Sequence, residues 1–355
     1  MNIFNVIGLM SGTSLDGLDL AYCRFELVEG KWRYAILKAA TFEYGEEWRD
    51  RLNSVFRSTA EAYARTHAEY GKYLGNQVSL FMKEQDIKEV DFVSSHGHTI
   101  FHQPASGFTA QIGEGAALAA SCGRMVVCDF RTSDVAYGGQ GAPLVPIGDR
   151  HLFPDHAYCL NLGGIANISF EKGTDRIAFD VCPCNMLLNH YAGLAGQPYD
   201  KNGEMAAAGK LHDGLLRELN AMPFYAKSYP KSLGREEVEK FFIPVIEKHG
   251  LSPADCLRTV CEHIAIQVSA TRSLASRENP GMLVSGGGAW NAFLMERIRH
   301  HAGITVEIPD AITINYKEAL IFAFLGVLRY RDEPNCFRSV TGASKDVVGG
   351  AIYLA

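Results

Sequence analysis

The stretch GLMSGTSLDGLDLAY, residues Gly8 to Tyr22, decides how the rest of the chain is read. An apolar strand breaks in a turn of Gly, Ser and Thr, and two aspartates, Asp16 and Asp19, follow it. The N–H groups of residues 11–14 are suited to form a nest for a phosphate, and either aspartate is suited to hold a water on Mg²⁺. The alternative is an ordinary tight hairpin whose aspartates bond locally. No G-x-x-x-x-G-K occurs, which excludes a Lys-bearing P-loop.

Three strands are predicted around this turn, and a similar set is predicted halfway along the chain. The first set covers residues 3–9, 18–27 and 32–39, and the second covers residues 157–162, 166–171 and 176–181. Because the antiparallel meander is repeated at half the chain length, we expect a duplicated, two-lobed α/β fold with a cleft between the lobes. The polar, Gly-rich residues 131–149 are the expected connection.

Composition places the chain among soluble globular proteins. Its 355 residues suit two domains, with 47% hydrophobic and 21% charged residues. A net charge of -6 and the lack of any basic block exclude a nucleic-acid partner. Nine cysteines without a C-x-x-C pair indicate reduced thiols, and neither a signal peptide nor an apolar run of about 18 residues is evident. We therefore expect a cytoplasmic protein without a membrane partner.

Two further small-residue turns resemble the first one. Gly163 and Gly164 lie between two predicted strands, and the triple glycine Gly286, Gly287 and Gly288 lies between a strand and a helix. Three such turns in two halves favour a nucleotide clamp. The chain has no G-x-G-x-x-G, which weakens a dinucleotide-binding alternative.

Asp180 ends a predicted strand in IAFDVCPCN, where Pro183 turns the chain away. A carboxylate at a strand end that faces a cleft is a candidate general base, and the alternative is an Asp that caps the next turn. Cys182 and Cys184 are interpreted as small buried hydrophobes.

Three histidines crowd SHGHTIFH, namely His96, His98 and His102, without a further group at ligand spacing. We therefore favour hydrogen bonding to a sugar or to the backbone over a metal. Glu318 begins a helix, where it suits the helix dipole or a ligand hydroxyl equally well.

Long motifs then identify a family. They are GLMSGTSLDGLD, SHGHTIFHQP, DFRTSDVAYGGQGAPLVP, LNLGGIANI, YDKNGEMAAAGK, PKSLGRE, SGGGAWNAFLM and TGASKDVVGGAIY. The chain resembles the anhydro-N-acetylmuramic acid kinases, which belong to the superfamily of acetate and sugar kinases, heat-shock ATPases and actin. The resemblance runs nearly end to end.

The resemblance implies a ribonuclease H-like (actin-like ATPase) fold with duplicated mixed sheets and an interlobe cleft. The N-terminal lobe is expected at residues 1–134 and the C-terminal lobe at 135–355, with the C-terminal segment as a candidate to pack back across the cleft. ATP and Mg²⁺ are the implied cofactors, with Asp16 and Asp19 near the metal through water. The implied nucleotide residues are Gly12, Thr13, Ser14, Leu15, Asp16, Gly17, Leu18, Asp19, Gly163, Gly164, Gly286, Gly287, Gly288 and Asn291. The implied sugar residues are His98, Thr99, Gln111, Asp129, Asn185 and Glu318.

In the family, water opens the anhydro bridge of the sugar, and ATP phosphorylates the freed 6-oxygen. Asp180 is the implied base, since the γ-phosphoryl group captures the departing oxygen in place of a proton donor. Where family members usually have DTGPGN, this chain has DVCPCN. It has His98 where the family has a Gln, and it has Asn189 where the family often has an acid. The alternatives are a non-catalytic sensor of the anhydro sugar and a kinase for a related amino sugar, and a homodimer is left open.

Overall fold

The computed structural model describes residues 2–12, 15–275 and 281–355, which form two compact units. Unit 1 contains Met1–Leu152 and Tyr316–Ala355, and unit 2 contains Phe153–Asn315. The boundary expected after residue 134 therefore falls inside unit 1, and residues 316–355 return to unit 1. The expected connection, residues 131–149, folds within unit 1 as helix α4 (Thr132–Ala136) and most of helix α5 (Val145–Leu152).

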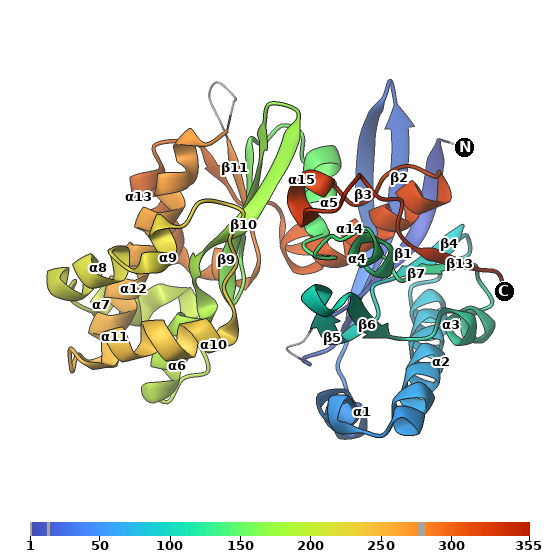
Figure 1. The fold of residues 1–355 in the computed structure, drawn as a ribbon, viewed down its shortest axis with the longest axis horizontal. Coiled ribbons are helices and arrows are strands. Elements are labelled where there is room, and N and C mark those ends of the chain that lie inside the picture. Colours follow the sequence, from blue (N-terminus) through green and yellow to red (C-terminus); the bar gives the residue numbers. More distant parts are fainter. Residues whose placement is uncertain (1, 13–14, 276–280) are drawn as a thin grey trace. The chain divides into compact units, whose positions relative to one another are not determined.

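Unit 1 is built on a six-stranded sheet with the strand order β13-β7-β4-β1-β2-β3 (Figure 1). The strands β1, β2 and β3 form an antiparallel meander, and β4 and β7 continue it in parallel to β1, as the sequence indicates for a mixed sheet. Their bounds are β1 Ile3–Ser11, β2 Leu18–Val28, β3 Lys31–Phe42, β4 Phe92–Ser95, β7 Val126–Cys128 and β13 Ala351–Tyr353.

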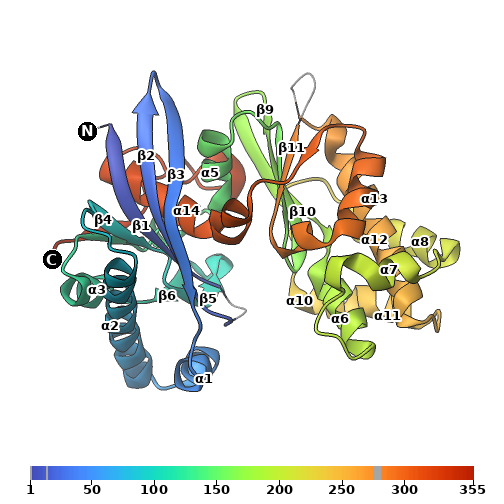
Figure 2. The same cartoon turned by 180° about the vertical axis from the view of Figure 1, so that it is seen from behind.

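Helices cover both faces of this sheet. On one face, α2 and α3 pack over the apolar side chains of β1, among them Ile7 and Leu9. On the other face, α14 places Phe324 against the rings of Phe25 and Trp32. A separate hairpin of β5 and β6 carries the histidine-rich motif (Figure 2). The bounds are α1 Glu46–Ser54, α2 Ala60–Glu84, β5 His98–Gln103, β6 Phe108–Ile112, α3 Gly115–Cys122, α14 Ala311–Tyr330 and α15 Arg338–Thr341.

Unit 2 repeats the same plan in a five-stranded sheet with the order β10-β9-β8-β11-β12. An antiparallel meander again comes first, and β11 pairs in parallel with its first strand, β8. The duplicated mixed α/β fold expected from the sequence is thus confirmed. The strands are β8 Tyr158–Leu162, β9 Ile165–Lys172, β10 Asp175–Pro183, β11 Met282–Ser285 and β12 Val306–Glu307. The helices are α6 Asn185–Leu194, α7 Glu204–Ala208, α8 Asp213–Asn220, α9 Pro223–Ala226, α10 Arg235–Glu237, α11 Ile243–Glu247, α12 Pro253–Ala270 and α13 Ala292–Ala302.

Helix α14 corrects one sequence expectation. It is long and apolar enough to cross a membrane, although 72% of its apolar window is buried inside the protein. Its backbone packs tightly on β1, because a Cβ added at Gly8 would lie 2.0 Å from the carbonyl oxygen of Ala319. A core helix buried on all sides is apolar all round, so the apolar run reflects this packing.

Candidate active site

The turn between β1 and β2 closes where Ser11 pairs with Leu18. Leu15 has a φ of 60°, and its N–H donates to the Gly12 carbonyl at 3.3 Å. The expected nucleotide residues Thr13 and Ser14 lie outside the described residues. Because the Leu18 side chain is fully buried in the core, only its main chain is available to a ligand.

Carboxylates gather beside this turn. Asp19 accepts a hydrogen bond from the Thr41 hydroxyl at 2.6 Å, and a Cβ at Gly17 would lie 2.7 Å from the Thr41 methyl group. Burial raises the pKa of Asp19, as does the nearby charge of Asp16. Burial also raises the pKa of Glu318, and the charge of Asp19 adds to that rise. Within the part of the chain that the structure describes, no three such side chains lie close enough together to hold a metal ion by themselves, so the metal role of Asp16 and Asp19 stays a prediction.

The hairpin of β5 and β6 brings three of the expected sugar residues together. His98 hydrogen-bonds through Nδ1 to the Ser11 hydroxyl at 2.8 Å. Thr99 pairs with Gln111 across the hairpin, and the Gln111 amide donates to the Thr99 hydroxyl at 3.3 Å. The Gln111 Oε1 atom is buried without a hydrogen-bond partner, so it is an acceptor available to a ligand.

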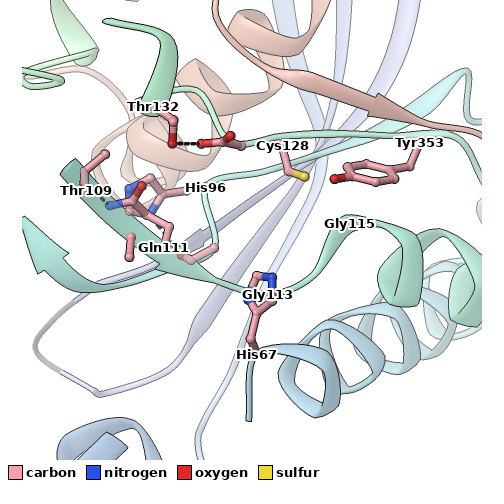
Figure 3. Close-up of a pocket in the computed structure, with 12 residues that line it drawn as sticks. His67, His96, Thr109, Gln111, Gly113, Gly115, Cys128, Thr132 and Tyr353 are labelled. Atoms are coloured by element: carbon pink, nitrogen blue, oxygen red, sulfur yellow. Dashed lines mark hydrogen bonds between the residues drawn. The ribbon is translucent and has the colours of Figure 1, made fainter. Parts of the chain in front are cut away.

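Next to this hairpin, unit 1 contains a polar cavity of about 190 Å³. Figure 3 shows Gln111 and Thr109 on one side of it, and Cys128 and Tyr353 on another. The lining residues are His67, His96, Gly97, Thr109, Ala110, Gln111, Gly113, Gly115, Cys128, Asp129, Thr132 and Tyr353. Two expected sugar residues, Gln111 and Asp129, therefore share one cavity.

Asp129 directly follows β7 and lies in the left-handed region, with a φ of 60°. Its carboxylate accepts from the Thr132 hydroxyl at 2.5 Å, and burial raises its pKa. A non-glycine residue held at positive φ at a strand end is typical of functional sites.

Arg131, which the sequence analysis did not single out, contacts His96, one of the residues that line the cavity. Its guanidinium lies 3.1 Å (Nε) and 3.0 Å (Nη2) from His96 Nε2, and it donates to the Gly141 carbonyl at 2.6 Å. Burial lowers its pKa to about 10, so it stays cationic at neutral pH. It follows Asp129 by two positions in the motif DFRTSD, and a lone Arg three positions after the buried strand β7 was the available signal.

In unit 2, the two expected glycine turns meet at the start of α6. Asn185 donates from its main chain to the Gly163 carbonyl at 3.1 Å and from its side chain to the Leu162 carbonyl at 3.0 Å. A Cβ at Gly288 would lie 3.2 Å from Asn185 Oδ1 and 2.7 Å from Leu162 Cβ. Residues from three separate motifs thus lie close together in unit 2.

Two of these glycines are not required by the protein's own packing. A Cβ built on Gly163 would meet its nearest atom at 3.4 Å, and one on Gly287 would meet it at 3.8 Å. Both are ordinary van der Waals distances, and neither residue has a positive φ. The open space beside both α-carbons suits a ligand that approaches the backbone closely.

Asn291, one of the expected nucleotide residues, is the N-cap of helix α13. Its Oδ1 atom accepts from the Leu294 N–H at 2.9 Å, as an N-cap does. The side chain is almost fully buried. Its role toward a nucleotide stays a prediction, and its cap role is an observation.

Asp180 lies near the end of β10, where the register with β9 shifts between Asp180 and Cys182. Bulges of this kind re-aim side chains beside active sites. The carboxylate accepts from the Leu233 N–H at 2.8 Å, and burial raises its pKa. Cys182 and Cys184 are both fully buried, and burial raises the pKa of each thiol, which makes them poor nucleophiles.

The expected residues divide between the units. Unit 1 holds residues 12–19, His98, Thr99, Gln111, Asp129 and Glu318, and unit 2 holds Asp180, Asn185, the glycines 163–164 and 286–288, and Asn291.

The similarity to known proteins extends over nearly the whole chain. The sequence profile of the family described as anhydro-N-acetylmuramic acid kinase matches residues 4–355. An anhydro-N-acetylmuramic acid kinase of Mannheimia succiniciproducens is 36% identical over 98% of both chains. One of Rhodopseudomonas palustris is 33% identical over 99% of both chains.

Among solved structures, component A of the Acidaminococcus fermentans (R)-2-hydroxyglutaryl-CoA dehydratase is 12% identical, with a TM-score of 0.45 over 90% of this chain and 96% of that chain. Likeness at this level says nothing about activity.

Proposed function

The chain belongs to the anhydro-N-acetylmuramic acid kinase family, and on that premise we propose that it opens anhydro-N-acetylmuramic acid with water and phosphorylates it from ATP to N-acetylmuramic acid 6-phosphate. The observation that carries the proposal is a family match that spans both units together with a half-buried carboxylate, Asp180, in the last part of β10.

Asp180 is the base of the proposed reaction. Its carboxylate takes a proton from a water molecule, and the water oxygen forms a bond to the anomeric carbon of the sugar. The bond between that carbon and the bridging oxygen breaks, and the bridging oxygen receives the γ-phosphoryl group, so ADP leaves. Since burial raises the pKa of Asp180, the carboxylate is a stronger base than an exposed one.

The glycine turns would hold the nucleotide. Gly163 and Gly287 leave room at their α-carbons, which supports close approach of phosphate oxygens to main-chain N–H groups. The turn at residues 12–19 offers a similar backbone surface in unit 1. Positioning by the backbone fits a chain that lacks a P-loop lysine.

The proposed sugar contacts of unit 1 come from its hairpin and its cavity. Gln111 Oε1 is a buried acceptor without a partner, and Asp129 lines the same cavity. Both suit sugar hydroxyl or amide donors. Asp16 and Asp19 would hold Mg²⁺ through water, and the metal, when bound, would neutralise phosphate charge.

Localisation and assembly belong to the same proposal. A chain without a nucleic-acid or membrane partner that acts on a small sugar and ATP is proposed to work in the cytoplasm. Residues that would form a homodimer are not assigned.

The decisive experiment uses anhydro-N-acetylmuramic acid, MgATP and heavy-oxygen water. We expect sugar-dependent release of ADP and a phosphorylated sugar that carries the heavy oxygen at the anomeric position, as read by mass spectrometry. ADP release with an unlabelled product would overturn the hydrolytic step. Sugar binding without ADP would leave a sensor, and turnover of another amino sugar alone would change the substrate.

A further inference from the structure

The segment Lys231–Leu233 forms two hydrogen bonds with Asp180. The Asp180 N–H donates to the Lys231 carbonyl at 3.0 Å, as in a strand pair. Two residues on, the Leu233 N–H donates to the Asp180 Oδ2 atom at 2.8 Å. The Asp180 carboxylate therefore accepts a hydrogen bond from a main-chain N–H group of a neighbouring segment.

The Lys231 side chain anchors this segment in a cage of three aromatic rings. Its ammonium lies 4.6 Å from the ring centre of Phe224, 5.7 Å from that of Phe179 and 5.8 Å from that of Tyr225. It also donates to the Phe224 carbonyl at 3.4 Å. Distances within about 6 Å mark cation–π contacts, so the cage fixes the cation from several sides.

Phe179 is the residue directly before Asp180, so the cage and the carboxylate share one strand. Leu233 is buried in the unit 2 core, which holds the far end of the segment. Lys231 and Leu233 thus fix the segment at both ends, and its hydrogen bonds fix Asp180 between them.

We propose that Lys231 is a positioning residue for Asp180: its caged cation holds the Leu233 N–H on Oδ2, which leaves Oδ1 as the atom that accepts the proton from water. This inference rests on the proposed function, because it deepens the role of Asp180 as base. The chain needs no second carboxylate to orient the base.

The charged and titratable groups around Asp180 set the expected pH effect. Burial raises the pKa of Asp180, the Leu233 N–H lowers it, and the charge of Glu237 raises it. Cys182 lies on the same strand with a thiol whose pKa burial raises, and Lys231 lies on the neighbouring segment. Loosening the segment removes the one contact that lowers the pKa, so the pKa of Asp180 rises.

The test compares Lys231→Met, Lys231→Arg and Lys227→Met in the full chain. Lys231→Met keeps the length of the side chain and removes the cation. Lys227 supplies the control, since its ammonium lies over the same Phe224 ring, at 5.7 Å, but its segment does not touch Asp180. The readouts are kcat, the KM for ATP and the acid limb of the profile of kcat/KM against pH.

For Lys231→Met we expect kcat to fall about 10- to 100-fold, the range that slight misplacement of a reacting group produces. The acid limb should move to higher pH, and the KM for ATP should stay within about twofold. Lys231→Arg should restore most of kcat, and Lys227→Met should resemble the wild type. A Lys231→Met variant with an unshifted acid limb, or an equal loss in Lys227→Met, would overturn the inference.

A measurement without turnover covers the case in which Lys231→Met does not fold. Hydrogen exchange of the peptide spanning residues 229–237 should quicken in Asp180→Ala, which removes the acceptor of the Leu233 N–H, and stay slow in Asp180→Asn. Equal exchange in the wild type, Asp180→Ala and Asp180→Asn would refute the inference, because the Leu233 N–H would then not be held by the Asp180 carboxylate. The wild type itself could show no sugar-dependent ADP release while the exchange result holds. The proposed function then fails, and the contact between residues 231–233 and Asp180 remains as a structural feature.

Discussion

The Ser11 hydroxyl, at the end of β1, lies 2.8 Å from Nδ1 of His98, at the start of β5. Ser11 also accepts from the Tyr44 hydroxyl at 2.7 Å, and Tyr44 lies 2.6 Å from the Tyr70 hydroxyl. This buried chain ties the turn of residues 12–19 to the hairpin that carries Thr99. Because Nδ1 is engaged by Ser11, Nε2 is the His98 atom that remains for a sugar.

His98 should make the protein sensitive to acid. Burial lowers its pKa to about 4, below the unfolded value of about 6.5, so the unfolded chain takes up the proton more readily. The stability contributed by neutral His98 is complete above pH 6.5 and is lost as pH falls toward 4. His98→Gln should shrink the loss of unfolding free energy between pH 7 and pH 5 by on the order of 2 kcal/mol, measured by urea titration.

Exposed His300 provides the control, because His300→Gln changes a ring outside the core. It should leave the difference between pH 7 and pH 5 unchanged. An equal effect of His98→Gln and His300→Gln would mean that the acid sensitivity comes from the overall charge of the protein and not from the burial of His98.

Gly287→Ala should weaken ATP binding without unfolding the protein. The added methyl group has space in the apo structure, with its nearest atom at 3.8 Å, but would block approach of a phosphate. We expect the Kd for ATP to rise about tenfold, the effect of about 1.4 kcal/mol, in calorimetry. Gly45→Ala is the matched control, since a Cβ there meets nothing within 4 Å. Unchanged affinity in Gly287→Ala would move the nucleotide away from this turn.

Asp19→Asn should raise the Mg²⁺ concentration needed for half-maximal activity by about tenfold, because one attractive charge is lost. Thr41→Val is a smaller change at the same site, because it removes only the hydrogen bond that the Thr41 hydroxyl donates to Asp19. The Thr41 hydroxyl lowers the pKa of Asp19, so its loss should raise the requirement less than Asp19→Asn does. A Mg²⁺ requirement equal to the wild type in both variants would exclude Asp19 from the metal site.

Both meanders could be predicted because their signals are local. Residues that favour strands are enriched between glycine-bearing turns, and the turn at Gly163 and Gly164 repeats the break of the opening stretch. Asp180 could be proposed from its place near the end of a predicted strand, although β10 continues to Pro183, so the expectation that Asp180 ends the strand was wrong.

Contacts between distant residues could not be predicted. The Leu233 N–H reaches Asp180 from 53 positions away, and no pattern along the chain records it. Asp134 was read as part of a connection, yet it is fully buried and accepts from Gly141 N–H at 2.7 Å and the Thr341 hydroxyl at 2.8 Å. Such long-range hydrogen bonds explain why the boundary lies beyond residue 134.

Asp180→Asn is the prediction on which the mechanism depends. The amide keeps the shape of the side chain and an oxygen for the Leu233 N–H, so the protein should fold and bind MgATP and the sugar as the wild type does. It cannot take the proton from water, and loss of a general base costs about two to four orders of magnitude in rate. A purely structural Asp180 predicts the opposite pattern, with about 1 kcal/mol of lost stability and nearly full activity. Steady-state release of ADP, thermal unfolding and calorimetric binding separate the two outcomes, and wild-type turnover by Asp180→Asn would redirect the search for the base to Glu318 or His98.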